Sequence, residues 1–414
     1  YLLTFTVRDD GSSRFSKENR WAVFPSAAFA YKMNKDLFPK SKTINDLKLR
    51  VGWGITGQQD INQGDYPYLG TYEQSIGNEA SYLRGYNNGI PIWVSLLRPA
   101  AYNPDLKWES TETYNAGIDF AILKNRIEGS VDVYQRKTKD LINAETKVPA
   151  GTNFREYVAA NIGSLENKGI EFSLNTKPIV SKDFTWEIGG NIAYNENKIT
   201  SLTYGDNAQS MRRYGMNVHK VGFSAGMYYV YEQIYDTNGK PIEGFYKDRN
   251  NDGIINENDL YIYHKPTPDY TFGVTTKFRY KQWDLSVTGH GSIGNYNFNA
   301  VAPNNAALSS SSIYANEFLV NRPTSALDTN FQTGHTLSDY YIQDASFFWI
   351  DNVVLGWSFK EVHKVFKGGR IYATVQNPFV FTKYKGLDPE VFGGIDNNVY
   401  PRPLTLMLGT NLNF

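Results

Sequence analysis

The sequence has 414 residues, and its 42 basic and 42 acidic side chains give a net charge of zero. This balance argues against nucleic acid as the partner, because phosphate binding depends on an excess of Lys and Arg. No window of about 18 apolar residues occurs, which argues against a membrane-spanning helix. Tyr (30), Phe (24) and Gly (35) are abundant, a composition typical of strands and turns.

The chain opens on Tyr1-Leu2-Leu3 inside what resembles a strand, without a Met start or a signal-like segment. We therefore expect one part of a longer protein. The absence of Cys is compatible with an oxidising envelope compartment. A mean hydropathy of −0.47 is compatible with a membrane barrel, since only alternate residues of each strand face lipid.

Apolar and polar residues alternate with a period of two in several segments. In the segment 184–194, Phe184, Trp186 and Ile188 alternate with Thr185 and Glu187. The same pattern recurs at 114–122, 270–280, 283–288 and 404–414. One face of such a strand suits hydrocarbon and the other a polar lumen, and aromatic residues at strand ends are typical of interfacial girdles. A soluble sandwich would also bury its apolar faces, but it would not need such long strands.

Connection lengths favour a barrel with an inside and an outside. Short connections at 123–126, 177–183 and 280–282 alternate with long ones at 57–111, 139–163, 197–269 and 295–341, as periplasmic turns alternate with extracellular loops. The segment Val218–Tyr235 also has a strand-like pattern, and we assign it to a long outer loop. Phe414 then falls on the periplasmic side. About twelve spanning strands are expected near 1–9, 19–33, 46–55, 111–123, 125–138, 166–178, 183–196, 269–280, 282–294, 343–359, 369–384 and 400–414.

Several motifs are more specific than barrel alternation. They are Arg8-Asp9-Asp10-Gly11-Ser12-Ser13-Arg14-Phe15, Trp21-Ala22-Val23-Phe24-Pro25-Ser26, Leu47-Lys48-Leu49-Arg50-Val51-Gly52-Trp53-Gly54, Leu106-Lys107-Trp108-Glu109, Asn377-Pro378-Phe379, and Thr382-Lys383-Tyr384-Lys385-Gly386-Leu387-Asp388-Pro389-Glu390. In this order and spacing the chain resembles the barrel of SusC/RagA-type TonB-dependent outer-membrane transporters of the Bacteroidetes.

The resemblance implies an all-β fold, a transmembrane antiparallel barrel in which residues 1–414 are the C-terminal part, with long extracellular loops, of a 22-stranded plugged barrel. The plug domain and the N-terminal barrel strands are absent from this sequence. The resemblance further implies a Gram-negative outer-membrane location, a SusD-type lipoprotein lid, energy from the TonB complex through the missing N-terminal part, and an oligosaccharide or oligopeptide cargo.

One local motif matches a calcium loop. Asp248, Asn250 and Asp252 occupy positions 1, 3 and 5, Gly253 position 6, the Ile254 carbonyl position 7 and Asp259 position 12. Ca²⁺ takes six to eight oxygen ligands, and glycine permits the sharp turn. The alternative is an Asn/Asp/Gly-rich turn that binds nothing. We favour a structural Ca²⁺ site that stiffens an outer loop.

No nucleophile motif, phosphate loop or Cys cluster occurs, and no organic cofactor is expected. The five histidines lack metal-ligand spacing. A glycosidase pair of carboxylates remains open, but inward Asp119, Asp132, Glu171 and Glu187 fit a wet lumen or plug contacts equally well. We expect no enzyme activity.

Aromatic residues of the first long loop are candidates for cargo or partner contacts. Aromatic faces stack on sugar rings and peptide side chains, and they are also enriched at protein interfaces. The candidates are Tyr66, Tyr68, Tyr72, Tyr86 and Trp93.

Three function classes follow from these observations. Active, TonB-dependent import of an oligomeric nutrient is favoured. The alternatives are a passive pore closed by these strands alone and a calcium-braced barrel that binds at the cell surface.

Overall fold

The computed structural model describes residues 1–60, 65–74, 81–147, 157–202, 211–309, 314–315, 318–319, 321–333, 337–362, 366–397 and 399–413. Among them, no helix combines the length and the apolar character needed to cross a membrane.

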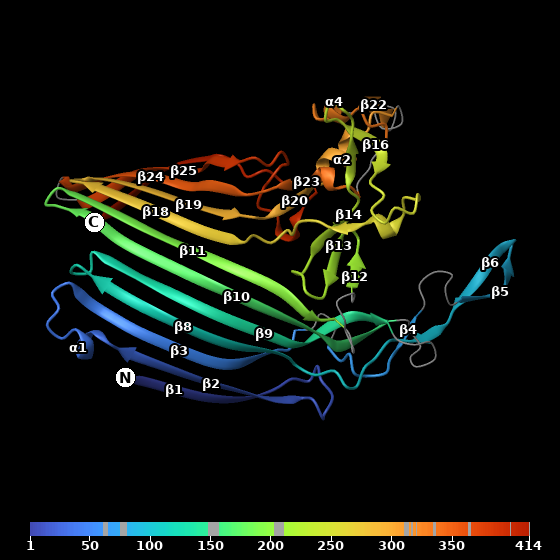
Figure 1. Ribbon diagram of the computed structural model, residues 1–414, viewed down its shortest axis with the longest axis horizontal. Helices are drawn as coiled ribbons and strands as arrows, with labels where there is room; N and C mark the ends of the chain where they lie inside the picture. The colour runs from blue at the N-terminus through green and yellow to red at the C-terminus, as the bar shows by residue number, and fades with distance from the viewer. Residues whose placement is uncertain are drawn as a thin grey trace.

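Twelve antiparallel strands form one continuous sheet (Figure 1), and each of them overlaps one of the twelve expected spanning strands. The prediction of about twelve strands is therefore confirmed. In sheet order they are β1 (Leu2–Gly11), β2 (Trp21–Lys32), β3 (Ile44–Gln58), β8 (Glu109–Ile122), β9 (Ile127–Lys147), β10 (Tyr157–Val180), β11 (Phe184–Ser201), β18 (Tyr270–Tyr280), β19 (Trp283–Ile293), β24 (Phe347–Val362), β25 (Phe366–Thr382) and β27 (Thr405–Asn413).

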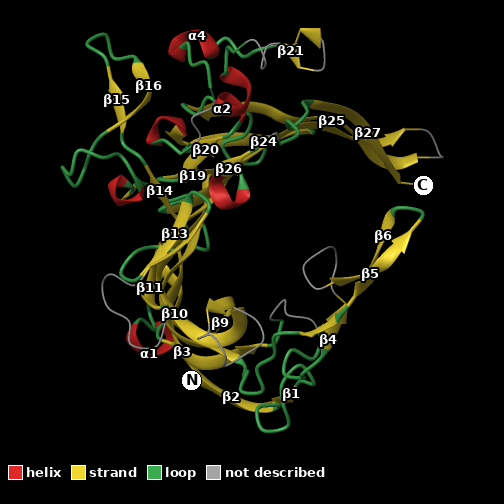
Figure 2. Ribbon diagram, turned by 90° about the vertical axis from the view of Figure 1, so that its right-hand side faces the viewer, coloured by secondary structure: helices red, strands yellow, loops and turns green. Residues whose placement is uncertain are grey.

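The sheet curves around an interior and stays open on one side (Figure 2). Its order begins at β1 and ends at β27, and the described residues of these two strands do not pair with each other. Short turns lie at one end and the long connections at the other (Figure 1). Asn413 pairs with Gly368 beside the short β24–β25 connection, so β27 runs toward the short-turn end as expected. Phe414 itself lies outside the described residues.

The two faces of the sheet differ as the alternation predicts. On the apolar face, aromatic rings pair across strands near the short-turn end, where Trp186 stacks on Phe278 with ring centroids 5.6 Å apart. A second set lies toward the opposite end, where Phe272 and Phe348 stack at 5.8 Å. Two aromatic bands separated along the strands are the pattern of membrane-interface girdles.

The connection expected at 139–163 is wrong in its extent. β9 continues to Lys147 and β10 starts at Tyr157, so the two strands pair well beyond Thr138. Three register shifts, between Val158 and Gly163 and after Gly163, interrupt this pairing. Bulges of this kind break the period of two, which explains why the sequence pattern ended early.

The connections after β11, β19 and β25 build a separate outer layer of small sheets and short helices. The segment Val218–Tyr235 contributes to it as expected, through parts of β13, β14 and β15. The strands are β12 (Met211–Tyr214), β13 (Asn217–Lys220), β14 (Met227–Val230), β15 (Gln233–Tyr235), β16 (Pro241–Tyr246), β17 (Tyr261–Ile262), β20 (Tyr296–Asn299), β21 (Tyr314–Ala315), β22 (Phe318–Leu319), β23 (Ile342–Asp344) and β26 (Ile395–Asp396). The helices are α2 (Val301–Ala306), α4 (Ala326–Thr329), η2 (Glu257–Asp259), η3 (Asp339–Tyr341) and η4 (Phe392–Gly394).

This outer layer has its own apolar core. Tyr228, Val230, Phe298, Phe331 and Tyr341 are buried against one another although they come from distant parts of the chain. The core holds together the connections that lead out of β11 and β19.

The first long connection leads away from this layer. It forms the ladder of β4 (Tyr72–Gln74) with β7 (Leu97–Pro99) and the projecting hairpin of β5 (Ser81–Asn87) with β6 (Ile90–Ser95) (Figure 1). A single helical turn, α1 (Asn34–Leu37), lies in the short connection between β2 and β3.

Candidate functional site

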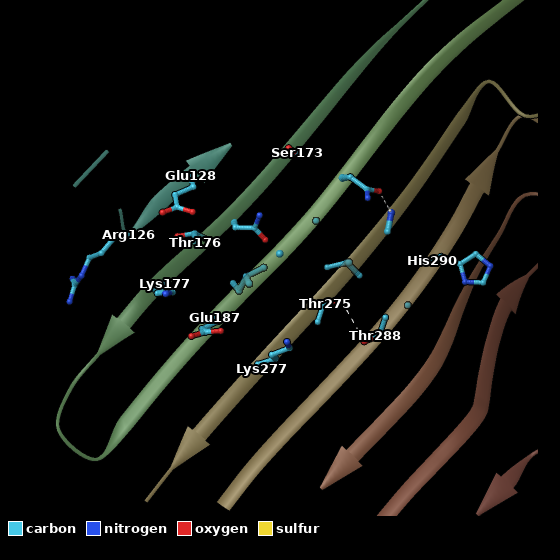
Figure 3. Close-up of a pocket in the computed structure, with 18 of the residues that line it drawn as sticks. Arg126, Glu128, Ser173, Thr176, Lys177, Glu187, Thr275, Lys277, Thr288 and His290 are labelled. Carbon is cyan, nitrogen blue, oxygen red and sulfur yellow. Dashed lines mark hydrogen bonds between the residues drawn. The ribbon is translucent and has the colours of Figure 1, made fainter. Parts of the chain in front are cut away.

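The polar face of the sheet carries a shallow hollow of about 590 Å³ across β9, β10, β11, β18 and β19. Figure 3 shows its side chains rising from neighbouring strands, with Glu187 and Lys277 toward one end and His290 toward the other. Hydrophilic groups of both signs line it, as in a wet lumen. The inward position expected for Glu187 is therefore confirmed.

Ion pairs bridge strands elsewhere on this face. Arg50 of β3 contacts Asp119 Oδ1 through Nη2 at 2.7 Å and Asp132 of β9 at 2.9 Å. Arg50 and Asp132 flank Gly117 of β8 in register. A Cβ at Gly117 would lie 2.2 Å from Asp132 Oδ1, so the pair meets over a position that only glycine leaves free. Asp119 and Asp132 thus lie on the same face of the sheet, with a basic partner within the sheet itself.

A larger groove of about 1410 Å³ lies where the sheet meets the outer layer. Asn191, Gly273 and His290 line both the hollow and the groove. The hollow and the groove therefore form one continuous surface. Most other groove residues come from the outer layer, and several of these are apolar. The apolar ones include Met216, Pro266, Pro268, Pro389, Val391, Phe392 and Ile395, and Phe347 of β24 adds a further apolar side chain.

A bulge in the sheet brings a charged side chain to the hollow. The registers of β24 with β19 and with β25 both shift at Asp351. Opposite it lie Asn377, whose φ is 52°, and Pro378, which has no N–H to donate to the ladder. The Asn-Pro-Phe motif thus forms this bulge. Asp351 reaches His290 Nδ1 at 2.8 Å.

The chain between β25 and β27 completes a charged cluster at the groove. His290 Nε2 lies 3.1 Å from Glu390 Oε2. Arg402 donates from Nε to Asp388 Oδ2 at 3.0 Å and from Nη2 to Glu390. Burial alone would lower the pKa of Arg402, but the carboxylates of Glu390 and Asp388 outweigh it and raise the pKa above its usual value. All five groups, Asp351, His290, Glu390, Arg402 and Asp388, are therefore paired within the cluster.

The predicted calcium loop is compact and hydrogen-bonded. Asp248 accepts from Gly253 N at 2.8 Å and Asp252 accepts from Ile254 N at 2.8 Å. Asp259 is fully buried and accepts from Arg249 N and Asn256 N, both at 2.9 Å. Gly253 has φ 80°, as the sharp turn requires. The N–H donors lower the pKa of Asp259, that of Asn256 most, so this carboxylate stays ionised.

Hard oxygen donors are present in the loop, and their chemistry suits Ca²⁺. No three His, Cys, Asp or Glu side chains form a metal-holding group within the described ranges. The Asp248, Asp252 and Asp259 carboxylates would have to draw together around a cation. Calcium binding, with Asn250 and the Ile254 carbonyl as further ligands, stays a prediction.

The five aromatic residues predicted from the first long loop do not gather in one place. Tyr66 and Tyr68 contact each other edge to face, with centroids 6.4 Å apart. Tyr72 lies on β4, while Tyr86 and Trp93 lie on the projecting hairpin, where they are 67% and 50% exposed. None of the five lines the hollow or the groove. Their role as cargo or partner contacts stays a prediction.

Sequence reasoning missed the groove and its most exposed residue. Phe392 lies on the connection between β25 and β27 and is fully exposed. The motif Leu387-Asp388-Pro389-Glu390 that precedes it marked the segment as distinctive. Its partners, however, come from β19, β24 and the outer layer, and only the fold brings them together.

Comparisons with known proteins agree with this architecture. A family model described as "TonB dependent receptor-like, beta-barrel" matches residues 1–378. The chain is 48% identical over 431 residues to the TonB-dependent receptor SusC of Bacteroides thetaiotaomicron, covering 100% of this chain and 42% of SusC. It is 31% identical over 458 residues to the TonB-dependent receptor P3 of Formosa agariphila, covering 100% of this chain and 44% of that receptor. The chain therefore spans less than half the length of these relatives.

Solved structures share the fold. The RagAB peptide importer in its closed-closed state matches with a TM-score of 0.80 at 24% identity, covering 100% of this chain and 46% of that chain. Its open-open state gives a TM-score of 0.81 with 45% of that chain covered.

Proposed function

This chain belongs to the TonB dependent receptor-like β-barrel family, in the SusC/RagA group, and on that premise we propose that its parent protein imports an oligomeric nutrient across the outer membrane. In this proposal the twelve strands are the C-terminal part of a larger barrel. A plug and further strands complete it, TonB supplies the energy, and a SusD-type lipoprotein covers the outer mouth. Binding and transport, without catalysis, are the proposed activity.

The observation that supports this proposal most directly is that the hollow and the groove form one continuous surface. The hollow begins among residues near the short turns, such as Arg126 and Lys177, and reaches His290, which also lines the groove. A cargo released from the groove would therefore meet a hydrated surface that leads toward the short-turn end. Such a surface is of use to a transporter, because each stage of passage offers new hydrogen-bond partners in place of water.

Oligosaccharides are the favoured cargo and oligopeptides the second choice. The groove combines apolar rings with neutral side chains such as Asn191 and Asn217. Sugar rings present apolar faces and hydroxyl edges that suit such a mixture.

The passive-pore alternative is less well supported. A closed pore would need β1 and β27 to pair, yet they are the two edges of an open sheet. Leu2, Leu3 and Phe5 of β1 are 67%, 76% and 69% exposed. An unpaired, apolar edge strand is a template for pairing with another strand, which supports further barrel strands in the parent protein.

Uptake by cells carrying the full-length parent protein tests the proposal. We expect labelled oligosaccharide to enter energised cells and uptake to fall to background when a protonophore collapses the inner-membrane gradient. Uptake that is insensitive to the protonophore would favour the passive pore. Surface binding without uptake would favour the adhesive alternative.

We further propose that Ca²⁺ stiffens the loop Asp248–Asp259. Addition of Ca²⁺ to metal-free protein is expected to slow proteolysis of this loop, and Asp248→Ala together with Asp252→Ala should abolish that protection. Equal proteolysis with and without Ca²⁺ would show that the loop is only a hydrogen-bonded turn.

A further inference from the structure

We propose that Phe392 is a specificity-determining contact of the importer. Its aromatic ring stacks on a sugar ring of the cargo, which is a neutral oligosaccharide. This inference rests on the proposed import function and assigns its recognition step to the groove.

Phe392 presents a complete aromatic surface to solvent. Its relative exposure is 105%, whereas the groove residue Phe347 is 6% exposed. Burial of an apolar side chain contributes favourable free energy, and a phenylalanine exposed to water lacks this contribution. A ligand that covers the ring recovers this contribution, and an aromatic face adds a preference for flat, apolar surfaces.

The backbone on the carboxyl side of Phe392 is held by buried hydrogen bonds. The hydroxyl of Tyr228 donates to Gly394 O at 2.6 Å, and Tyr228 is itself fully buried. Ile395 pairs with Phe298 in a parallel bridge. Asp396 is fully buried and accepts from Tyr384 OH at 3.0 Å and Leu387 N at 2.7 Å.

The amino side is anchored as well. Asn297, only 1% exposed, donates from Nδ2 to Pro389 O at 2.9 Å. Between the two anchors, Gly393 and Gly394 have φ of 79° and 74°, which other residues adopt only with strain. A Cβ on Gly394 would lie 2.3 Å from both Pro266 and the Tyr228 hydroxyl. The ring of Phe392 is thus free while its backbone is fixed, so little conformational entropy is lost when a ligand covers it.

Each charged or titratable side chain that lines the groove already has a partner. Glu390 pairs with both Arg402 and His290, and Arg402 pairs with Asp388 as well. The remaining titratable lining residue, His219, also has an interaction partner. A peptide with free termini would bring charges that these paired groups do not neutralise. A neutral sugar brings hydroxyls instead, and Asn191, which accepts from Gly273 N at 3.0 Å, keeps its amide N–H groups as donors to them.

The test is binding of a panel of neutral oligosaccharides to the purified full-length parent protein by titration calorimetry. Phe392→Ala should weaken binding of the recognised oligosaccharide about tenfold. Phe392→Trp should retain it, because the flat face is kept. Phe392→Leu, which keeps apolar bulk and loses the flat face, should lose most of the affinity. Phe245→Ala is the matched control, since Phe245 is 63% exposed in the outer layer and lies outside the groove.

The outcomes separate this inference from the import function. Wild-type affinity in Phe392→Ala or in Phe392→Leu, with uptake intact, would overturn the stacking role and leave import standing. Equal weakening by Phe245→Ala would overturn the assignment to the groove. Tighter binding of charged oligopeptides than of neutral oligosaccharides would overturn the ligand class. Absence of uptake by cells that carry the wild-type parent protein would contradict the import function itself.

Discussion

Replacement of the buried carboxylate of Asp396 tests whether hydrogen bonds hold the groove segment. Oδ2 of Asp396 accepts from Leu387 N at 2.7 Å, Tyr384 OH at 3.0 Å and Asp388 N at 3.4 Å. Oδ1 is buried and has no partner among the residues that the structure describes. Asp396→Ala would leave these buried donors unsatisfied, at about 1 kcal/mol each and roughly 3 kcal/mol together. Asp396→Asn can keep one oxygen at the Oδ2 position and should destabilise the segment less than Asp396→Ala.

Hydrogen exchange followed by mass spectrometry on the full-length protein measures this difference. A loss of about 3 kcal/mol corresponds to roughly hundredfold faster exchange of the amides in 384–397 through local opening. Amides of β18, Tyr270–Tyr280, serve as the internal reference and should not change. Unchanged exchange in Asp396→Ala, or an equal increase in Asp396→Asn, would refute the reasoning.

Three further substitutions test other parts of the structure. Gly117→Ala should push Asp132 away from Arg50 and lower the free energy of unfolding, measured in urea, by about 1–3 kcal/mol. Ala116→Ser, on the opposite face of the sheet, is the control, and wild-type stability of Gly117→Ala would contradict the predicted steric clash. Arg402→Lys cannot reach Asp388 and Glu390 together as the guanidinium does, so we expect a lower Tm; an unchanged Tm would show that the cluster adds nothing. The pKa of Asp259 is lowered in the folded state. The ionised carboxylate therefore stabilises the folded loop above the unfolded-state pKa of about 3.9, and this stabilisation is lost as the pH falls through the folded-state pKa. Resistance of the Asp259 loop to proteolysis should fall over this pH range, and Asp259→Asn should remove the pH dependence. If wild type and Asp259→Asn show the same dependence of proteolysis on pH, Asp259 is not its source.

The strands were predictable because their physics is local. Alternation at 184–194 and 270–280 identifies two faces, and the turns at 123–126 and 281–282 separate strands that pair with their sequence neighbours. The pattern failed where bulges shift the register, as between Val158 and Gly163.

The groove was not predictable for a different reason. Its segment depends on Tyr228, Asn297 and Phe298, which are separated from Phe392 by long stretches of chain. Nothing in the neighbourhood of Phe392 in the sequence shows that its backbone is anchored and its ring left free. Aromatic content alone favoured Tyr86 and Trp93, which lie on the projecting hairpin instead.

Energy-dependent uptake is the most direct measurement of the central claim, active import. Cells carrying the full-length parent protein should accumulate a labelled neutral oligosaccharide above its external concentration, and a protonophore should abolish that accumulation. Entry that only equilibrates with the medium and ignores the protonophore would contradict active import.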